Sequence, residues 1–197
     1  MKKRTINDLE KEIRLLRRLA YLDALTGLYN RHGFITETQK FISEMSIPDG
    51  RVSQRQNTLI RHMSLVLVDA DHFKKINDVY GHKTGDMALK LLASTIMGRV
   101  RDLDVVGRWG GEEIILALPG ALEENAYTIA DSIREKIEQA HIMSGKKKVK
   151  FTISAGVCVF NTSKTLNENI HDVDVALYEA KHLGRNRVVR YSEMKKT

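Results

Sequence analysis

A nearly continuous apolar run at residues 63–68, MSLVLV, constrains the fold of this 197-residue chain more than any other segment. The run is rich in Val and Leu and does not alternate with polar residues, which is typical of a strand buried on both faces of a sheet. It ends in Asp69. Because open α/β sheets tend to bind ligands at the carboxyl ends of their strands, the sequence predicts that Asp69 lies at a binding edge of a central strand.

Helical and strand-like patterns interleave along the rest of the chain, in the order β-α-α-β-β-α-β-α-β from residue 63 onward. This order predicts an α/β sandwich in which helices flank a mixed, mainly antiparallel central sheet. Helices are predicted at 30–45, 84–100, 122–140 and 169–183, and strands at 105–106, 114–116, 151–160 and 187–191. Apolar side chains expected to point inward are Leu89, Leu92, Ala93 and Ile96 in one helix and Ile170, Val173, Leu177 and Ala180 in another.

The segment RWGGEE at 108–113 joins two of these short strands. Its Gly110-Gly111 pair predicts a two-residue hairpin turn, which requires positive φ angles. Glycine also lets another molecule approach the backbone closely. The adjacent carboxylates of Glu112 and Glu113 repel each other unless a cation or a proton offsets their charge. An isolated GGEE is nevertheless more often a surface hairpin with solvated glutamates, because short motifs match by chance.

A second acidic cluster, at Asp69 and Asp71, favours a functional site over a solvated surface hairpin. If the strand ending at Asp69 pairs with the hairpin, the carboxylates of Asp69 and Glu112 converge, with the Ala70 carbonyl as a third oxygen. Such hard oxygen ligands suit Mg²⁺, which usually retains waters and also binds substrate phosphates. The alternative is that Asp69 caps a helix starting near Asp71. Capping explains one aspartate but neither the glycines nor the glutamates.

Together these motifs resemble the GGDEF family of diguanylate cyclases. The resemblance covers about residues 21–191, and the matching segments occur in the family's order. They are DALTGLYNR (23–31), DADHFK (69–74), NDVYGH (77–82), GD (85–86), RWGGEE (108–113), SAGV (154–157), ALYEAK (176–181) and GRN (184–186).

The resemblance implies both a fold and a reaction. The fold is a ferredoxin-like palm related to those of polymerases and nucleotide cyclases. The reaction condenses two GTP into cyclic di-GMP and two pyrophosphates, in a homodimer with one GTP per protomer. By motif position, Asp69, the Ala70 carbonyl and Glu112 are the ligands of Mg²⁺ or Mn²⁺, with two ions per active half-site. Glu113 is a further catalytic candidate, as a metal ligand or as a proton acceptor.

The resemblance also implies how substrate is bound. Asn77 and Asp86 would recognise guanine, since a carboxylate can accept from both N1–H and the exocyclic amine. The alternative for Asp86 is a helix N-cap. The phosphates would contact Lys74, Lys181 and Arg185 and the backbone near Phe73. For Lys181, a charge that complements a helix dipole is the rival interpretation.

The segment RDLD at 101–104 fits the family's RxxD product-inhibition motif. Arginine is suited to bidentate contacts with phosphate and guanine. Arg101 and Asp104 are therefore expected to bind cyclic di-GMP as an inhibitor. The alternative is a solvated turn in which acidic and basic residues mix.

The bulk composition excludes several other classes. The chain carries 32 Lys and Arg against 25 Asp and Glu, a net charge of +7, but these residues are scattered apart from Lys146–Lys148 in a predicted loop. A polyphosphate ligand or simple solubility accounts for the excess, so we expect no nucleic-acid partner. No apolar run is long enough to span a bilayer, and no signal peptide is recognisable, so a cytoplasmic location is expected. The lone Cys158 is expected to be a small buried residue.

Two segments flank or interrupt the predicted catalytic domain, 21–197. Residues 1–20 are expected to form an amphipathic helix, with Ile6, Leu9, Ile13 and Leu16 spaced as in a coiled-coil seam. This helix would be a stalk linking the domain to an upstream sensory domain not contained in this chain, or would pack on its own domain. Residues 46–62 form an irregular basic insertion to which we assign no function.

Overall fold

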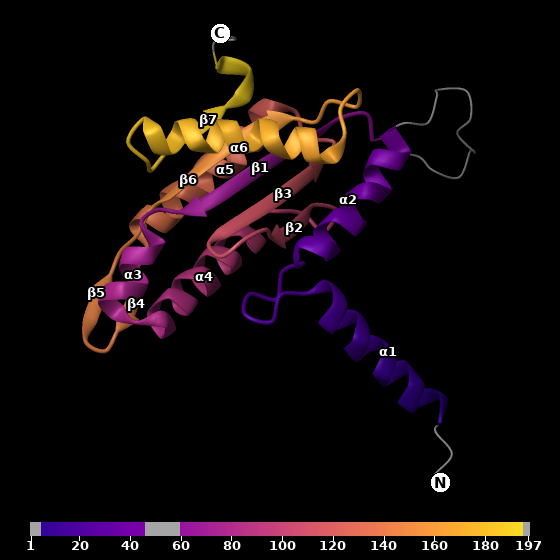
Figure 1. Cartoon of the computed structure of the whole chain (residues 1–197), viewed down its shortest axis with the longest axis horizontal. Helices are drawn as coiled ribbons and strands as arrows, with labels where there is room; N and C mark the ends of the chain where they lie inside the picture. Colours follow the sequence, from indigo (N-terminus) through magenta and orange to yellow (C-terminus); the bar gives the residue numbers. More distant parts are fainter. Residues whose placement is uncertain (1–4, 46–59, 195–197) are drawn as a thin grey trace.

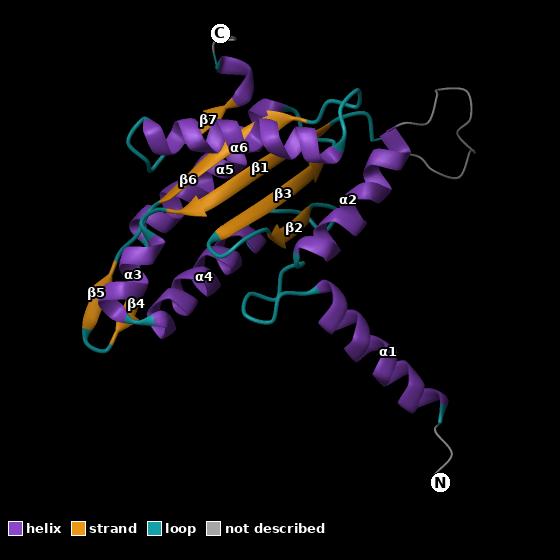
Figure 2. Cartoon of the chain, in the orientation of Figure 1, coloured by secondary structure: helices purple, strands orange, loops and turns teal. Residues whose placement is uncertain are grey.

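The computed structural model describes residues 5–45 and 60–194, so the predicted insertion at 46–62 lies almost wholly outside the described residues. Helices and strands interleave around one central sheet (Figures 1 and 2). The helices are α1 (Ile6–Tyr21), α2 (Arg31–Met45), α3 (Phe73–Tyr80), α4 (His82–Met97), α5 (Glu123–Gln139) and α6 (Leu166–His182), followed by a short 3-10 helix (Tyr191–Glu193). The strands are β1 (Met63–Ala70), β2 (Val105–Arg108), β3 (Glu113–Pro119), β4 (Ile142–Ser144), β5 (Lys147–Val149), β6 (Ile153–Val159) and β7 (Val188–Arg190).

The central sheet has the strand order β2-β3-β1-β6-β7. Neighbouring strands are antiparallel except β6 and β7, which are parallel. β1 lies in the middle, and all eight of its residues are buried, as the continuous apolar run predicted. The predicted mixed, mainly antiparallel sheet with flanking helices is confirmed.

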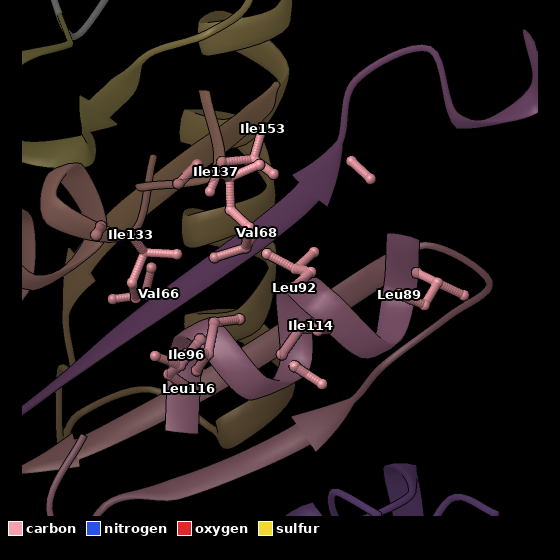
Figure 3. Close-up of a cluster of buried hydrophobic side chains, with 14 of the residues drawn as sticks. Val66, Val68, Leu89, Leu92, Ile96, Ile114, Leu116, Ile133, Ile137 and Ile153 are labelled. Atoms are coloured by element: carbon pink, nitrogen blue, oxygen red, sulfur yellow. The ribbon is translucent and has the colours of Figure 1, made fainter. Parts of the chain in front are cut away.

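The two faces of β1 build two hydrophobic clusters, since successive side chains of a strand point to opposite faces. Val66 and Val68 pack with side chains of α4 and α5 such as Leu92 and Ile137 (Figure 3). Leu65 and its same-face neighbours pack with side chains of α2 and α6. Asp69 has the same parity as Leu65, so it belongs to the face that α6 covers.

The sequence interpretation missed one small sheet. β4 and β5 pair as an antiparallel hairpin, so Lys147 and Lys148 lie in a strand and not in the predicted loop. These strands have only three residues each, which is too short for an apolar periodicity to be detected. The hydroxyl of Ser144 in β4 is 3.2 Å from that of Thr84 in α4, which docks the hairpin on that helix.

Two helices also begin earlier than predicted. α6 begins at Leu166 and not at 169, because Thr165 and Glu168 form a capping box that starts the helix earlier. α4 begins at His82 and not at 84, directly after Gly81, whose φ of 83° separates it from α3.

Helix α1 extends away from the body of the domain (Figure 1). Thr5 and Asp8 form a capping box at its start. In the single chain several of its apolar side chains are exposed, among them Ile6 (78%), Leu16 (57%) and Leu19 (68%), while the predicted seam residue Ile13 lies outside the residues whose side chains are described. Among the described helices, none combines the length and apolar character needed to cross a membrane.

Candidate active site

The carboxyl end of β1 brings together the acidic groups that the motifs contain. Asp69 is directly opposite Glu113 of β3 in the sheet register, so both carboxylates belong to the face that α6 covers. Glu112 is half-buried in the loop immediately before β3. From α6, the ammonium of Lys181 lies 2.9 Å from Oδ2 of Asp69. A buried carboxylate thus has two further carboxylates and one cation as neighbours.

The electrostatics of this corner favour binding of additional positive charge. The pKa of Asp69 is raised to about 6, mainly by burial and also by the charges of Glu112 and Glu113, while the hydrogen bond and charge of Lys181 act in the opposite direction. Burial also raises the pKa of Glu113, with Lys181 acting in the opposite direction and Asp174 and Glu112 in the same one. Lys181 therefore offsets only part of the repulsion, and a divalent cation would offset more.

The donor atoms fit a magnesium-type ion. Asp69 and the two glutamates supply carboxylate oxygens, and Ala70 ends the same strand with a backbone carbonyl. Within residues 5–45 and 60–194, however, no cluster of three or more His, Cys, Asp or Glu side chains is arranged to hold a metal. A few protein oxygens without a complete ligand shell are expected for Mg²⁺, since waters and substrate phosphates usually complete its coordination.

The loop of the GGEE motif is wider than predicted. Arg108 pairs with Ile114, so five residues lie between the paired strands, and neither Gly110 nor Gly111 has a positive φ angle. The predicted two-residue turn is therefore wrong, because a two-residue turn would require a positive φ angle in this glycine pair. The amides of Trp109 and Gly110 donate to the Glu113 carbonyl over 2.9 and 3.4 Å.

The absence of a side chain at Gly110 lets the Glu113 carboxylate approach the backbone closely. A Cβ at this position would lie 2.5 Å from Oε2 of Glu113, whereas a Cβ on Gly111 would have no neighbour within 4 Å. Any side chain at position 110 would therefore clash with the Glu113 carboxylate in its present position.

The side chain of Arg108 connects the GGEE loop to Asp23. Its Nη1 lies 3.1 Å from Oδ2 of Asp23, and its Nε and Nη2 donate to the Gly111 carbonyl over 3.2 and 2.7 Å. The segment around Asp23 is in turn bound to β2, because the Tyr29 amide donates to Val106 and the Arg108 amide donates to Tyr29. The guanidinium thereby connects the end of α1 with the acidic loop.

Asp71 is a buried anchor that sequence reasoning missed. Its carboxylate accepts hydrogen bonds from the hydroxyls of Thr152 and Ser154, both at 2.7 Å, and from the Asn186 amide at 3.1 Å. It thus ties the end of β1 to β6 and to the loop between α6 and β7. The available signal was its place in the DADHFK motif, which we interpreted only as a helix start.

The guanine candidates lie where α3 meets α4. The Asn77 side chain lies so close to Gly85 that a Cβ there would overlap its amide oxygen. Asp86 is exposed in the first turns of α4, one residue further on. The N-cap of α4 is Gly81, so the capping alternative for Asp86 is wrong.

The phosphate candidates lie around the start of α3. His72, the N-cap of α3, has a φ of 56° and makes no side-chain cap. Within the described part of the chain, the amides of Phe73 and Lys74 have no hydrogen-bond acceptor, which leaves them free for an anion. Arg185 is half-buried in the loop after α6, with a φ of 65°. Lys181 lies in the last turn of α6, so its contact with Asp69 and a favourable helix-dipole interaction coexist.

Arg101 and Asp104 lie at the far end of the β2–β3 hairpin. Arg101 donates to Asp104 through its amide (2.7 Å) and through Nη2 (2.9 Å), and also to the Pro119 carbonyl (3.0 Å). Pro119 and Glu113 are the two ends of β3, which are about 20 Å apart at ~3.3 Å per residue. The pair borders a cavity of about 500 Å³ that also contacts Tyr29 and Glu37.

Comparisons with known proteins identify the family of this chain. The family model "Diguanylate cyclase, GGDEF domain" matches residues 20–187. The chain is 39% identical over 188 residues to "Diguanylate cyclase DgcM" of Escherichia coli (strain K12), covering 93% of this chain and 42% of that protein. It is 35% identical over 167 residues to "Diguanylate cyclase A" of Treponema denticola, covering 84% and 43%. The chain therefore spans less than half the length of these curated relatives.

Solved structures show the same fold. The coiled coil and GGDEF domain of DgcB from Caulobacter crescentus, in complex with c-di-GMP, has a TM-score of 0.82 at 26% identity, covering 94% of this chain and 93% of that one. The active GGEEF domain of a diguanylate cyclase from Vibrio cholerae has a TM-score of 0.63 at 32% identity, covering 68% and 85%. With its fold, its ordered motifs and the match to residues 20–187, the chain belongs to the GGDEF domain family.

Proposed function

We propose that this domain is an active diguanylate cyclase, which condenses two GTP into cyclic di-GMP and releases two pyrophosphates. The observation that carries the proposal is the convergence of Asp69, Glu112 and Glu113 beside Lys181 at the end of the central strand. The named activity of its relatives supports the same conclusion.

In this proposal Asp69, the Ala70 carbonyl and Glu112 hold two divalent ions, Mg²⁺ or Mn²⁺, in each half-site. Such ions, when bound, neutralise phosphate charge and lower the pKa of an attacking hydroxyl. Glu113 either joins the ligands or accepts the proton of the GTP 3′-hydroxyl. Its raised pKa, caused mainly by burial, brings it closer to that of an effective base.

The remaining side chains orient the substrate. Asn77 and Asp86 bind guanine, and an adenine base would leave the Asp86 carboxylate without its two donors. The free amides of Phe73 and Lys74 bind phosphate together with the side chains of Lys74 and Arg185. Lys181 also contributes, either to the phosphates or by holding Asp69 in place.

The proposed enzyme acts as a homodimer, because each protomer supplies one GTP and a ring needs two. The exposed apolar face of α1 supports a parallel coiled coil that would join two copies. Residues 1–20 would then be a stalk below an upstream sensory domain, and 21–197 the catalytic domain. Since GTP is the substrate, we place the reaction in the cytoplasm.

Cyclic di-GMP is also proposed as an inhibitor that binds at Arg101 and Asp104. The cavity beside them has the room for a phosphate-bearing ligand, and the Arg101 guanidinium is largely exposed to it. Product at this site would contact the segment around Tyr29 that connects α1 with β2.

Nucleotide turnover tests the proposal. The full chain with Mg²⁺ is expected to convert GTP but not ATP to a cyclic dinucleotide, with a rate per protomer that rises with protein concentration. Asp69→Asn and Glu112→Gln should abolish turnover, while Asp78→Asn, an exposed carboxylate of α3, should retain it. Retained activity in both site variants would refute the assignment of the carboxylates.

The same assay separates a silent binding module from an enzyme. A chain that binds cyclic di-GMP through Arg101 and Asp104 but makes none from GTP would contradict the catalytic proposal. Arg101→Ala in an active enzyme should instead raise the cyclic di-GMP concentration that halves the rate.

A further inference from the structure

A second cavity lies between α3 and the β4–β5 hairpin and extends to Asp71 and His72, just before α3. We call it the α3–β5 groove. It has a volume of about 650 Å³ and is lined by Lys75, Ile76, Val79 and Tyr80 of α3 and by residues 148–152. Figure 1 shows α3 and the two strands side by side at one end of the molecule.

The groove lies on the reverse side of α3 from the guanine candidates. Lys75 and Asn77 are two residues apart, which separates their side chains by about 200° around a helix. Asn77 faces Gly85 of α4, whereas Lys75 lines the groove. A ligand in the groove would therefore leave the guanine candidates, Asn77 and Asp86, open.

The groove carries excess positive charge. Within the described part of the chain, the ammonium groups of Lys75, Lys148 and Lys150 have no ion-pair partner. The two carboxylates in its wall are already engaged. Asp71 accepts its three hydrogen bonds, and Glu138 accepts from Arg134 at 3.0 Å and from the Asn186 side chain at 2.7 Å. The three lysine ammonium groups are therefore available to bind an anion.

An apolar surface accompanies these charges. Ile76 and Phe151 are buried in the floor of the groove. Val79 and Tyr80 border it and are 59% and 38% exposed. Apolar and aromatic side chains beside unpaired cations suit a ligand that has both a planar part and phosphates.

We propose that the α3–β5 groove binds a phosphorylated small molecule of nucleotide size. Its phosphates contact Lys75, Lys148 and Lys150, and its planar part lies against Val79 and Tyr80. The volume is within the range of ~300–1,000 Å³ typical of small-molecule sites. The carboxylate of Glu138 in the wall of the groove adds a negative charge that disfavours a longer polyanion.

The groove is physically connected to the proposed catalytic site. Asp71 and Glu138 both hold Asn186, which follows Arg185, the proposed phosphate ligand. A ligand that shifts this wall would shift Arg185, so we infer that occupancy changes GTP turnover. This regulatory step rests on the proposed cyclase function, whereas binding to the groove does not.

Calorimetric titration of the full chain with ADP, without divalent metal, tests binding. ADP is the probe because the proposed GTP site selects guanine. The double variant Lys148→Gln/Lys150→Gln should weaken ADP binding about tenfold or more, since two charge-assisted contacts are lost. The matched control, Lys146→Gln/Lys147→Gln in the same hairpin, removes the same charge outside the groove and should leave the affinity unchanged.

Further titrations locate the ligand. Val79→Glu should also weaken ADP binding, while Asn77→Ala should not. Absence of ADP binding at millimolar concentration, equal loss in both double variants, or loss in Asn77→Ala would overturn the proposal. Pyrophosphate binding as tightly as ADP would refute the role of the planar part, and tighter binding of a single-stranded oligonucleotide would refute the small-molecule assignment.

The regulatory step has its own readout. Added ADP should change the rate of GTP turnover in the wild type but not in Lys148→Gln/Lys150→Gln. A chain that binds ADP through these lysines yet makes no cyclic di-GMP would refute the cyclase proposal and leave the binding site intact. An active enzyme whose turnover ignores bound ADP would refute the regulatory step alone.

Discussion

Substitution of Asp71 tests most sharply which contacts hold the end of β1 to β6 and to the loop after α6. The variant Asp71→Asn keeps the shape of the side chain but removes its charge. The wild-type carboxylate accepts three hydrogen bonds, from Thr152, Ser154 and the Asn186 amide. In the variant, the amide NH₂ must replace one accepting oxygen. The backbone N–H of Asn186 cannot become an acceptor, so the NH₂ group is expected to face Ser154, whose hydroxyl can rotate.

The expected loss of stability follows from these contacts. A hydrogen bond to a charged group contributes about 1.5–3 kcal/mol, against about 0.5–1.5 for a neutral pair, so three weakened bonds cost about 3 kcal/mol. Release from burying a charge offsets part of this cost. We therefore expect the free energy of unfolding to fall by about 2 kcal/mol, or Tm by about 4–8 °C for a chain of this length.

Urea unfolding followed by circular dichroism measures the change. Asp78→Asn, which removes an exposed carboxylate of α3 seven residues further along the chain, is the control and should stay within about 0.5 kcal/mol of wild type. Thr152→Val should cost less in the Asp71→Asn background than in wild type, because the two groups share one bond. Equal stability of Asp71→Asn and Asp78→Asn would refute the anchoring role of Asp71.

Three further outcomes are expected. Gly110→Ala should reduce turnover by displacing the Glu113 carboxylate while Gly111→Ala, in open space, retains it; equal rates in steady-state assays would contradict the close approach. Gly156→Ala places a Cβ against the backbone of α6, which cannot yield as a flexible side chain can, and should lower the free energy of unfolding by about 3 kcal/mol or more in a urea titration. Burial raises the pKa of the Cys158 thiol to about 12, so the neutral thiol persists in the folded protein well above neutral pH. A thiol reagent should therefore react with the native chain only slowly at pH 8 and rapidly in urea, and fast native labelling would contradict this burial.

Strong local patterns made the fold predictable from sequence. The apolar run of β1 lacks any polar alternation, and its burial on both faces follows directly from that. Every side chain predicted to point inward from α4 and α6 is buried, because a stripe at helical spacing can be satisfied only by contact with a core. These are Leu89, Leu92, Ala93, Ile96, Ile170, Val173, Leu177 and Ala180.

Features set by long-range contacts were not predictable. The GGEE loop is wide because β2 and β3 pair in a register that no local signal encodes. The strands of the β4–β5 hairpin are too short to be recognised from their pattern, and the hairpin is held partly by a contact with α4. Asp71 and Lys181 have partners that are distant in sequence, so their contacts emerge only from the folded chain.

Binding of Mn²⁺ in the presence of GTP, followed by electron paramagnetic resonance, tests the central claim most directly. The wild-type chain should bind the ion with the nucleotide, while Asp69→Asn and Glu112→Gln should weaken this binding and Asp78→Asn should not. Unchanged Mn²⁺ affinity in both Asp69→Asn and Glu112→Gln would contradict the claim that these carboxylates form a metal-dependent nucleotide site.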